Sequence, residues 1–308
     1  MFDFRYHALS LAAVLLALAV GVVIGVAIGD SDLVSSAKSG IVHQLKEEVA
    51  EAQRHSGELS TQLHEGEAFT SDLYPIAVHG LLGGENVGLA FLGSSSNSIN
   101  TYVRDAVTQA GGSLTTVVAF REPLDLEGLS HAAEGTRFQS LGAESASTSG
   151  EPGEKAGTLI ESFGSIVGKQ LVSGGRDVER ELISRVRGRL LTAFDGQLGK
   201  LDALVLVRND PSASSPEQSE ASEQFEDGFV AGVAKAGITL VGVEQTSTEP
   251  SQVPWYQGKD IASVDDVQAT AGQAALVYAL TGSHGAYGTK PTADSLLPNV
   301  LGSAASAP

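Results

Sequence analysis

Residues 8–29 constrain this chain more than any other stretch, because they read ALSLAAVLLALAVGVVIGVAIG without a charged side chain. Ser10 is the only polar side chain among these 22 residues. A helix of this length is about 33 Å long, enough to cross a hydrocarbon core of roughly 30 Å, and it satisfies its own backbone groups in lipid. We therefore predict that residues 1–29 comprise a short N-terminus and a single transmembrane helix.

Two other interpretations of the apolar run remain open. A cleaved signal peptide has a shorter apolar region, of about 7–15 residues, with a small-residue cleavage site at its end. Here Ala17-Leu18-Ala19 lies in the middle of the run. A buried core helix is the second alternative, although a helix that is apolar on all sides is unusual in a soluble domain. The length of the run favours the uncleaved anchor.

The charges that flank the run predict its orientation. Arg5 precedes it, whereas Asp30 and Asp32 follow it, and Lys38 is the first cation beyond. Cations tend to stay on the cytoplasmic side of a membrane. We therefore expect a single-pass protein of the cell membrane, with a cytoplasmic N-terminus and an extracytoplasmic body.

Gly21, Gly25 and Gly29 are spaced four residues apart within this run. The spacing places three bare patches on one helix face, where a second helix backbone could approach closely. We name these three glycines as candidate helix-pairing residues. Glycine is also common in membrane helices generally, so the pattern has low specificity.

Residues 30–75 are polar, favour a helix and accept a heptad register. Its two seam positions are occupied by Val42, Val49, Ser56, Leu63 and Thr70, and by Leu45, Ala52, Leu59, Gly66 and Leu73. Seven of these ten side chains are apolar, which predicts a parallel coiled-coil stalk that joins chains in a homodimer or higher oligomer. The alternative is an amphipathic helix folded back on the body. Pro75 is expected to end the helix.

Residues 76–290 alternate apolar, β-branched runs with helical patterns. The predicted strands cover residues 86–92, 114–120, 203–207, 238–243 and 259–264, and the predicted helices cover residues 98–110, 158–172, 176–195, 218–236 and 267–280. This alternation predicts an α/β globular domain with a doubly wound, mostly parallel sheet. We expect residues 139–157 to form a surface loop or disordered insert, and residues 291–308 a flexible tail.

The chemistry visible in the sequence is sparse. The loop Gly93–Asn97 follows the first predicted strand and precedes a helix, where anions bind in such folds, but helix capping is the favoured interpretation of its serines. Asp210 and Glu244 follow later strands, and we interpret them as solvated loop carboxylates. Since no nucleophile elbow, zinc-protease motif or cysteine is present, we expect no catalytic residue and no enzyme activity.

Composition argues further against several partners and cofactors. The formal net charge of −18 would repel nucleic-acid phosphates, so no nucleic-acid partner is expected. Copper(I) prefers sulfur ligands, yet the chain has no cysteine and one methionine, Met1. The seven histidines do not pair at three- or four-residue spacing. No cofactor is evident, and metal-binding residues stay unassigned.

Several stretches resemble the MctB family of actinobacterial envelope proteins, known as copper transport outer membrane proteins or copper transporters. They are residues 4–14 (FRYHALSLAAV), residues 17–22 (ALAVGV), residues 285–288 (GAYG) and residues 296–298 (LLP). The likeness extends in layout over nearly the whole chain, and its specific part is the N-terminal stretch.

The resemblance implies a role in copper efflux or tolerance, with copper as a possible transported ion and, from the family name, an outer-membrane location. The family also includes SteB-like members, which implies an alternative. Those proteins are membrane-anchored coiled-coil partners of SteA that control septal cell-wall hydrolysis, so an envelope or division protein is a possible partner. The sequence itself predicts one apolar helix and buried α/β strands, whereas outer-membrane pores are β-barrels. An anchored scaffold or regulator suits this layout better.

Overall fold

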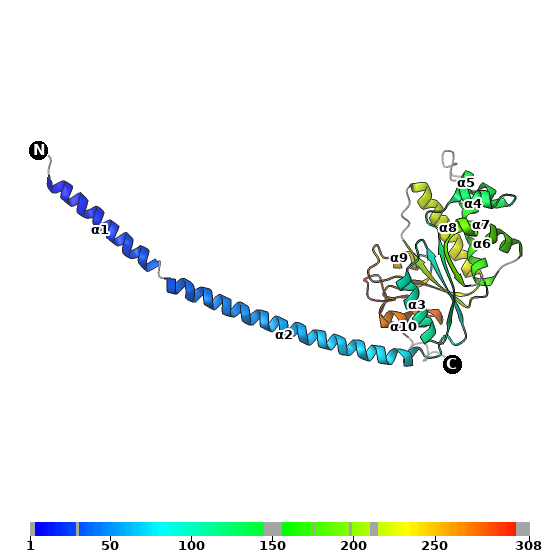
Figure 1. Ribbon diagram of the computed structural model, residues 1–308, viewed down its shortest axis with the longest axis horizontal. Helices are drawn as coiled ribbons and strands as arrows, with labels where there is room; N and C mark the ends of the chain where they lie inside the picture. The colour runs from blue at the N-terminus through cyan, green and yellow to red at the C-terminus, as the bar shows by residue number, and fades with distance from the viewer. Residues whose placement is uncertain are drawn as a thin grey trace. The chain divides into compact units, whose positions relative to one another are not determined.

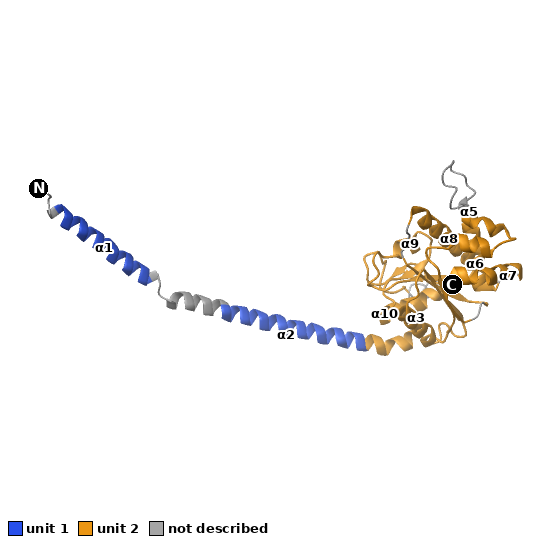
Figure 2. Cartoon of the chain, turned by 45° about the horizontal axis from the view of Figure 1, so that its top comes forward, with its two compact units in different colours: residues 1–68 blue, residues 69–308 orange. Residues whose placement is uncertain are grey.

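The computed structural model describes residues 4–28, 31–144, 156–174, 177–196, 199–209 and 215–299. Two compact units are distinguished in the chain, residues 1–68 and residues 69–308 (Figure 2). The first unit contains two helical segments, and the second contains a β-sheet with its covering helices.

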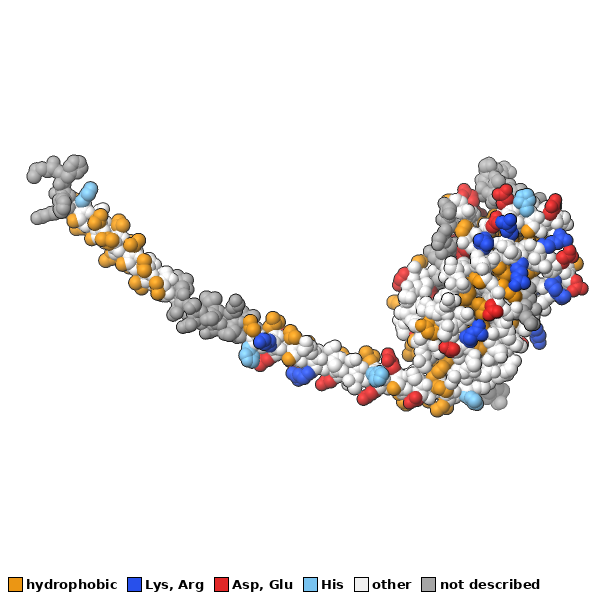
Figure 3. Space-filling view, in the orientation of Figure 1, with side chains coloured by type: hydrophobic (Ala, Val, Ile, Leu, Met, Phe, Trp, Pro, Cys, Tyr) orange, Lys and Arg blue, Asp and Glu red, His pale blue; other side chains and the backbone are white. Residues whose placement is uncertain are grey.

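Helix α1 (Phe4–Ile28) contains the stretch Tyr6–Ala27, which is long and apolar enough to cross a membrane. Its leucine and valine side chains are exposed in the single chain, and Figure 3 shows them along the helix. An apolar helix of this length with exposed side chains fits a single-pass anchor. Helix α2 (Ser31–Val78) has 48 residues and includes Gly57 and Gly66 without a break.

The predicted end of this helix at Pro75 is wrong, because α2 continues to Val78. Pro75 lacks the N–H that would bond to the carbonyl one turn earlier. Contacts within the second unit hold the last turn instead. Val78 is fully buried, and Tyr278 Oη donates a 2.9 Å hydrogen bond to the carbonyl oxygen of Ala77.

A seven-stranded sheet forms the centre of the second unit (Figure 1). In chain order its strands are β1 (Asn86–Leu92), β2 (Ser113–Phe120), β3 (Leu191–Gly196), β4 (Ala203–Arg208), β5 (Thr239–Val243), β6 (Ala262–Val264) and β7 (Ala286–Tyr287). Their spatial order is β3-β2-β1-β4-β5-β6-β7, and every pair is parallel except β2 with β3. The chain therefore extends the sheet first on one side of β1 and then on the other.

The two faces of the sheet enter two hydrophobic cores. In β1, Ala90 and Leu92 belong to one core, while Leu89 and Phe91 belong to the other. The first core is covered by α4 (Leu126–Ala132), η1 (Arg137–Ser140), α5 (Leu141–Glu144), α6 (Ala156–Ser173), α7 (Asp177–Leu190), α8 (Pro216–Lys235) and α9 (Val253–Gln257), and the second by α3 (Asn97–Gln109) and α10 (Thr270–Leu280) (Figure 1). This arrangement confirms the predicted α/β class with a mostly parallel sheet covered on both faces.

Helices α6 and α8 pack backbone against backbone. Four glycines make this close approach possible, and we call them the glycine contact: Gly164, Gly168, Gly228 and Gly232. A Cβ at any of them would lie less than 3.0 Å from a backbone carbonyl oxygen of the opposite helix, closer than real Cβ atoms come. Side chains are therefore excluded from the line along which the two helices cross, as in close-packed membrane helices.

The five predicted strands are present as β1, β2, β4, β5 and β6. The helix predicted over residues 176–195 is wrong at its end, because α7 stops at Leu190 and β3 follows directly. Strand β3 lies at the edge of the sheet and none of its residues is buried, so its sequence lacks the continuous apolar run of the buried strands. Strand β7 has two residues, too few to leave a periodic pattern.

The loop predicted over residues 139–157 is wrong at both ends. Helices η1 and α5 occupy its start and α6 begins at Ala156, while residues 145–155 lie outside the described residues. The buried side chains of Phe138 and Leu141 hold the first of these turns in the core. Within the predicted tail, the Asp294 carboxylate accepts a 2.9 Å hydrogen bond from the N–H of Ala286.

Replacing Gly228 by alanine is expected to lower the free energy of unfolding by about 2–3 kcal/mol, because the new methyl group must push α6 and α8 apart. Chemical denaturation of the purified full chain measures the change. Gly188→Ala is the matched control: Gly188 is exposed in α7 with no atom near its Cβ position, so alanine there should add up to about 1 kcal/mol. Equal effects of the two substitutions would contradict the close contact.

Candidate functional site

The carboxyl ends of β1 and β4 lie side by side where the strand order reverses, which is the usual ligand position in doubly wound sheets. The Gly93–Asn97 loop follows β1 at this point. Ser96 Oγ accepts a hydrogen bond from the Ile99 N–H at 3.4 Å and caps α3, as predicted. Asn209 Nδ2 donates to the Ser94 carbonyl at 2.9 Å. The loop thus uses these polar groups within the chain.

Arg208 ends β4 and is the centre of a buried polar network. Its Nε donates to Glu226 Oε2 at 2.9 Å, and its Nη1 donates to Gln252 Oε1 at 2.6 Å. Its guanidinium carbon lies 4.9 Å from the centre of the Trp255 ring. The Tyr256 hydroxyl accepts from the Arg208 backbone N–H at 2.9 Å. Four side chains from two helices and the loop before α9 therefore fix this strand end.

Glu226 reaches Arg208 from α8, where it is almost completely buried. Burial raises the pKa of Glu226 to about 8, although Arg208 opposes the shift, and the charges of Glu122 and Asp227 raise the pKa further. Glu226 Oε1 and Ser222 Oγ have no hydrogen-bond partner among the described residues. Both residues line a cavity of about 10 Å³, room for one water molecule.

A second buried pair lies at the ends of β5 and β6. Lys290 Nζ donates to Glu244 Oε1 and to the Thr248 carbonyl, both at 2.6 Å. Asp265 accepts hydrogen bonds from the backbone N–H groups of Thr289 and Lys290 at 2.8 and 3.0 Å. Glu244 is 1% exposed, so our interpretation of it as a solvated loop carboxylate is wrong. Asp210 lies outside the described residues.

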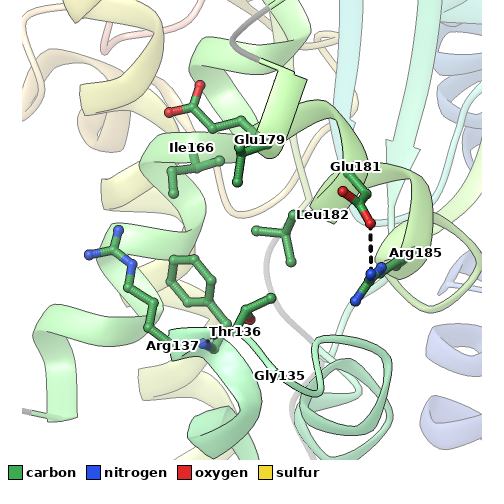
Figure 4. Close-up of a pocket in the computed structure, with 10 residues that line it drawn as sticks. Gly135, Thr136, Arg137, Ile166, Glu179, Glu181, Leu182 and Arg185 are labelled. Atoms are coloured by element: carbon green, nitrogen blue, oxygen red, sulfur yellow. Dashed lines mark hydrogen bonds and ion pairs between the residues drawn. The ribbon is translucent and has the colours of Figure 1, made fainter.

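A cavity of about 640 Å³ opens between α7 and the η1 segment, and we call it the α7 cavity. It is lined by Gly135, Thr136, Arg137, Phe138, Ile166, Val178, Glu179, Glu181, Leu182 and Arg185 (Figure 4). Its volume falls within the range of roughly 300–1,000 Å³ found for small-molecule sites. None of these residues carries a recognised motif, and their three segments lie far apart in the sequence, so sequence reasoning missed this cavity.

The structure leaves the metal and helix-pairing predictions as they were. In the part of the chain that the structure describes, no three His, Asp or Glu side chains gather as possible metal ligands. A Cβ at Gly21 or Gly25 would meet no atom of the single chain within 4 Å, and Gly29 lies outside the described residues. Pairing through these glycines stays a prediction.

Together, these features define a class: a doubly wound α/β protein with a buried ionic network at the sheet's carboxyl edge and an N-terminal helix of membrane-spanning length. The sequence matches the family described as "Copper transport outer membrane protein, MctB" over residues 1–298. The chain belongs to this family, as its N-terminal resemblance predicted. Proteins named "Copper transporter MctB" from Mycobacterium bovis and Mycobacterium tuberculosis are 25% identical to it over 315 residues, covering 94% of this chain and 96% of theirs.

Stability is expected to depend on pH through Glu226. The pKa of Glu226 in the folded protein, about 8, exceeds its ordinary value of 4.5. Its contribution to the free energy of unfolding is therefore fully present below pH 4.5 and is lost as pH rises toward 8. Within this range the free energy of unfolding falls by up to about 1.4 kcal/mol per pH unit. Glu226→Gln should remove this decline, measured by chemical denaturation between pH 5 and 8.5. Glu223→Gln, on the exposed side of α8, is the control. Parallel pH profiles of wild type and Glu226→Gln would refute the prediction.

Proposed function

We propose that this protein is a membrane-anchored protein of the cell envelope that acts in copper transport and tolerance. The observation that carries the proposal is the family match over residues 1–298, which includes both the apolar helix and the α/β unit. Relatives that match 94% of this chain are named copper transporters. Copper is then the transported ion, and no enzymatic reaction or resident cofactor is assigned to the chain.

The proposed topology places the N-terminus in the cytoplasm, α1 across the membrane and the α/β unit outside. The support is the charge difference across α1, with Arg5 on one side and Asp30 and Asp32 on the other. The family description instead names the outer membrane, a location that differs from this proposed topology. An extracytoplasmic α/β unit would meet copper on the far side of the membrane from the cytoplasm.

We also propose that the chain works as a homodimer or higher oligomer, joined through α1 and a coiled coil in α2. One apolar helix per chain cannot enclose a polar path across lipid. The predicted seam is open to a partner, since Val42, Leu45, Val49, Leu59 and Leu63 are between 45% and 68% exposed. Burial of these side chains against a second α2 would remove that apolar surface from water.

Deleting the gene is expected to raise cell copper and to slow growth in copper-supplemented medium, because an efflux route is lost. Metal analysis of washed cells and growth curves measure both effects. The full-length gene should restore both values, whereas a copy that lacks residues 1–30 should not, because its product has no anchor. Unchanged copper content and growth after deletion would reject the proposed role.

The coiled coil can be tested with single cysteines, because the natural chain has none. Val49→Cys occupies the predicted seam, and we expect it to form a disulfide-linked dimer in membranes under mild oxidation. Glu47→Cys, two residues away and outside the seam, is the matched control and should stay monomeric. Gel electrophoresis without reductant separates the two forms. Equal cross-linking at the two positions would contradict the register.

A further inference from the structure

The α7 cavity has an apolar floor between two polar walls (Figure 4). Phe138 and Leu182 on the floor are 2% and 6% exposed, and Ile166 of α6 packs against the same core. Val178 borders the cavity from the first turn of α7 and is 80% exposed. An exposed β-branched side chain beside an apolar floor is a surface that an apolar ligand would cover.

The charged side chains that line the cavity differ in whether they already have a partner. Arg185 Nη2 lies 2.7 Å from Glu181 Oε1, so these two charges neutralise each other. Glu179 is only 9% exposed and has a partner of its own. The guanidinium of Arg137 lies 4.6 Å from the centre of the Phe138 ring and makes no ion pair among the described residues. Among the charged residues that line the cavity, Arg137 is therefore the one whose charge is available to a ligand.

Helix α7 supports this arrangement. Its first turn contains Asp177 and Glu179 and its last turn contains Arg187 and Arg189, an order that complements the helix dipole. The C-terminal end of α7 is also held by a hydrogen bond, because Arg121 Nε donates to the Arg189 carbonyl at 3.0 Å. The wall of the cavity is thus a stable helix, and the remaining cation, Arg137, lies on the opposite wall (Figure 4).

From this geometry we propose that the α7 cavity binds a carboxylic acid with an apolar chain, such as a medium-chain fatty acid. The carboxylate would accept hydrogen bonds from Arg137, and the chain would lie over Ile166, Leu182 and Val178. A single available cation selects one anionic group, and the volume suits a small molecule. A cationic ligand is disfavoured, because both acidic side chains of the wall already have partners. This proposal does not rest on the proposed function.

The test uses the full chain in lipid nanodiscs and a dodecanoic acid that carries a photoreactive diazirine. After illumination, mass spectrometry of peptides should find the label on residues 177–185 and around Ile166. Excess unlabelled dodecanoate should compete, and the corresponding diazirine alcohol should label these peptides at least about tenfold less, because it lacks the charge that Arg137 binds.

Arg137→Gln should reduce labelling at these peptides by a similar factor while the thermal unfolding of the protein stays unchanged. Arg180→Gln is the matched control, because Arg180 is 61% exposed on α7, pairs with Asp177 and does not line the cavity. It should label like wild type. Labelling spread evenly along the chain, equal labelling by acid and alcohol, or an unaffected Arg137→Gln variant would each overturn the proposal.

Discussion

The direct backbone contact between α6 and α8 determines the arrangement of the rest of the α/β unit. The glycine contact lets the two helices approach without intervening side chains, and their neighbouring phenylalanines then reach the sheet: Phe225 and Phe229 pack edge-on against Phe120, with ring centres 5.6 and 5.1 Å away. The same contact sets the distance between α8 and β4, and therefore lets Glu226 accept the hydrogen bond from Arg208. Packing on one face of the sheet thus determines the polar geometry at its edge.

That polar geometry is mostly internal. A parallel sheet buried on both faces leaves its strand ends as the place where charged side chains can emerge, and here these side chains are turned back into the protein. The side chains of Arg208 and Lys290 are 8% and 9% exposed, and each contacts a carboxyl group whose side chain is 1% exposed. Removing one partner of such a pair is costly, because it leaves the other group buried and uncompensated. The small-molecule volume lies elsewhere, between α7 and η1.

Sequence patterns predicted the elements whose environment is uniform. Residues 87–92 are buried on both faces, so their continuous apolar run predicts the strand directly. Predictions from sequence patterns failed where tertiary contacts determine the local structure. Helix α2 continues beyond Pro75 because Val78 is buried in the second unit. Strand β3 forms where a helix end was predicted, because it pairs with Phe120 and its neighbours in β2. The α7 cavity and the Glu226 site could not be predicted, since each combines residues from separate segments. The spacing of Gly164 with Gly168 and of Gly228 with Gly232 was a usable signal for the helix contact, and it resembles the spacing already noted in residues 21–29.

The pairing of Lys290 with Glu244 has a consequence for synthesis. Glu244 is buried just after β5, and its cation comes from Lys290, 46 residues later in the chain and after β6 and α10. Ser251 Oγ and the Gln252 N–H also donate to this carboxylate, so before Lys290 leaves the ribosome Glu244 has hydrogen-bond donors but lacks its cation. Strands β1 to β4 precede both residues in the chain, whereas the Glu244 carboxylate gains its cation only when Lys290 follows. The Glu244 side of the sheet is therefore expected to be the last part of the α/β unit to close during synthesis.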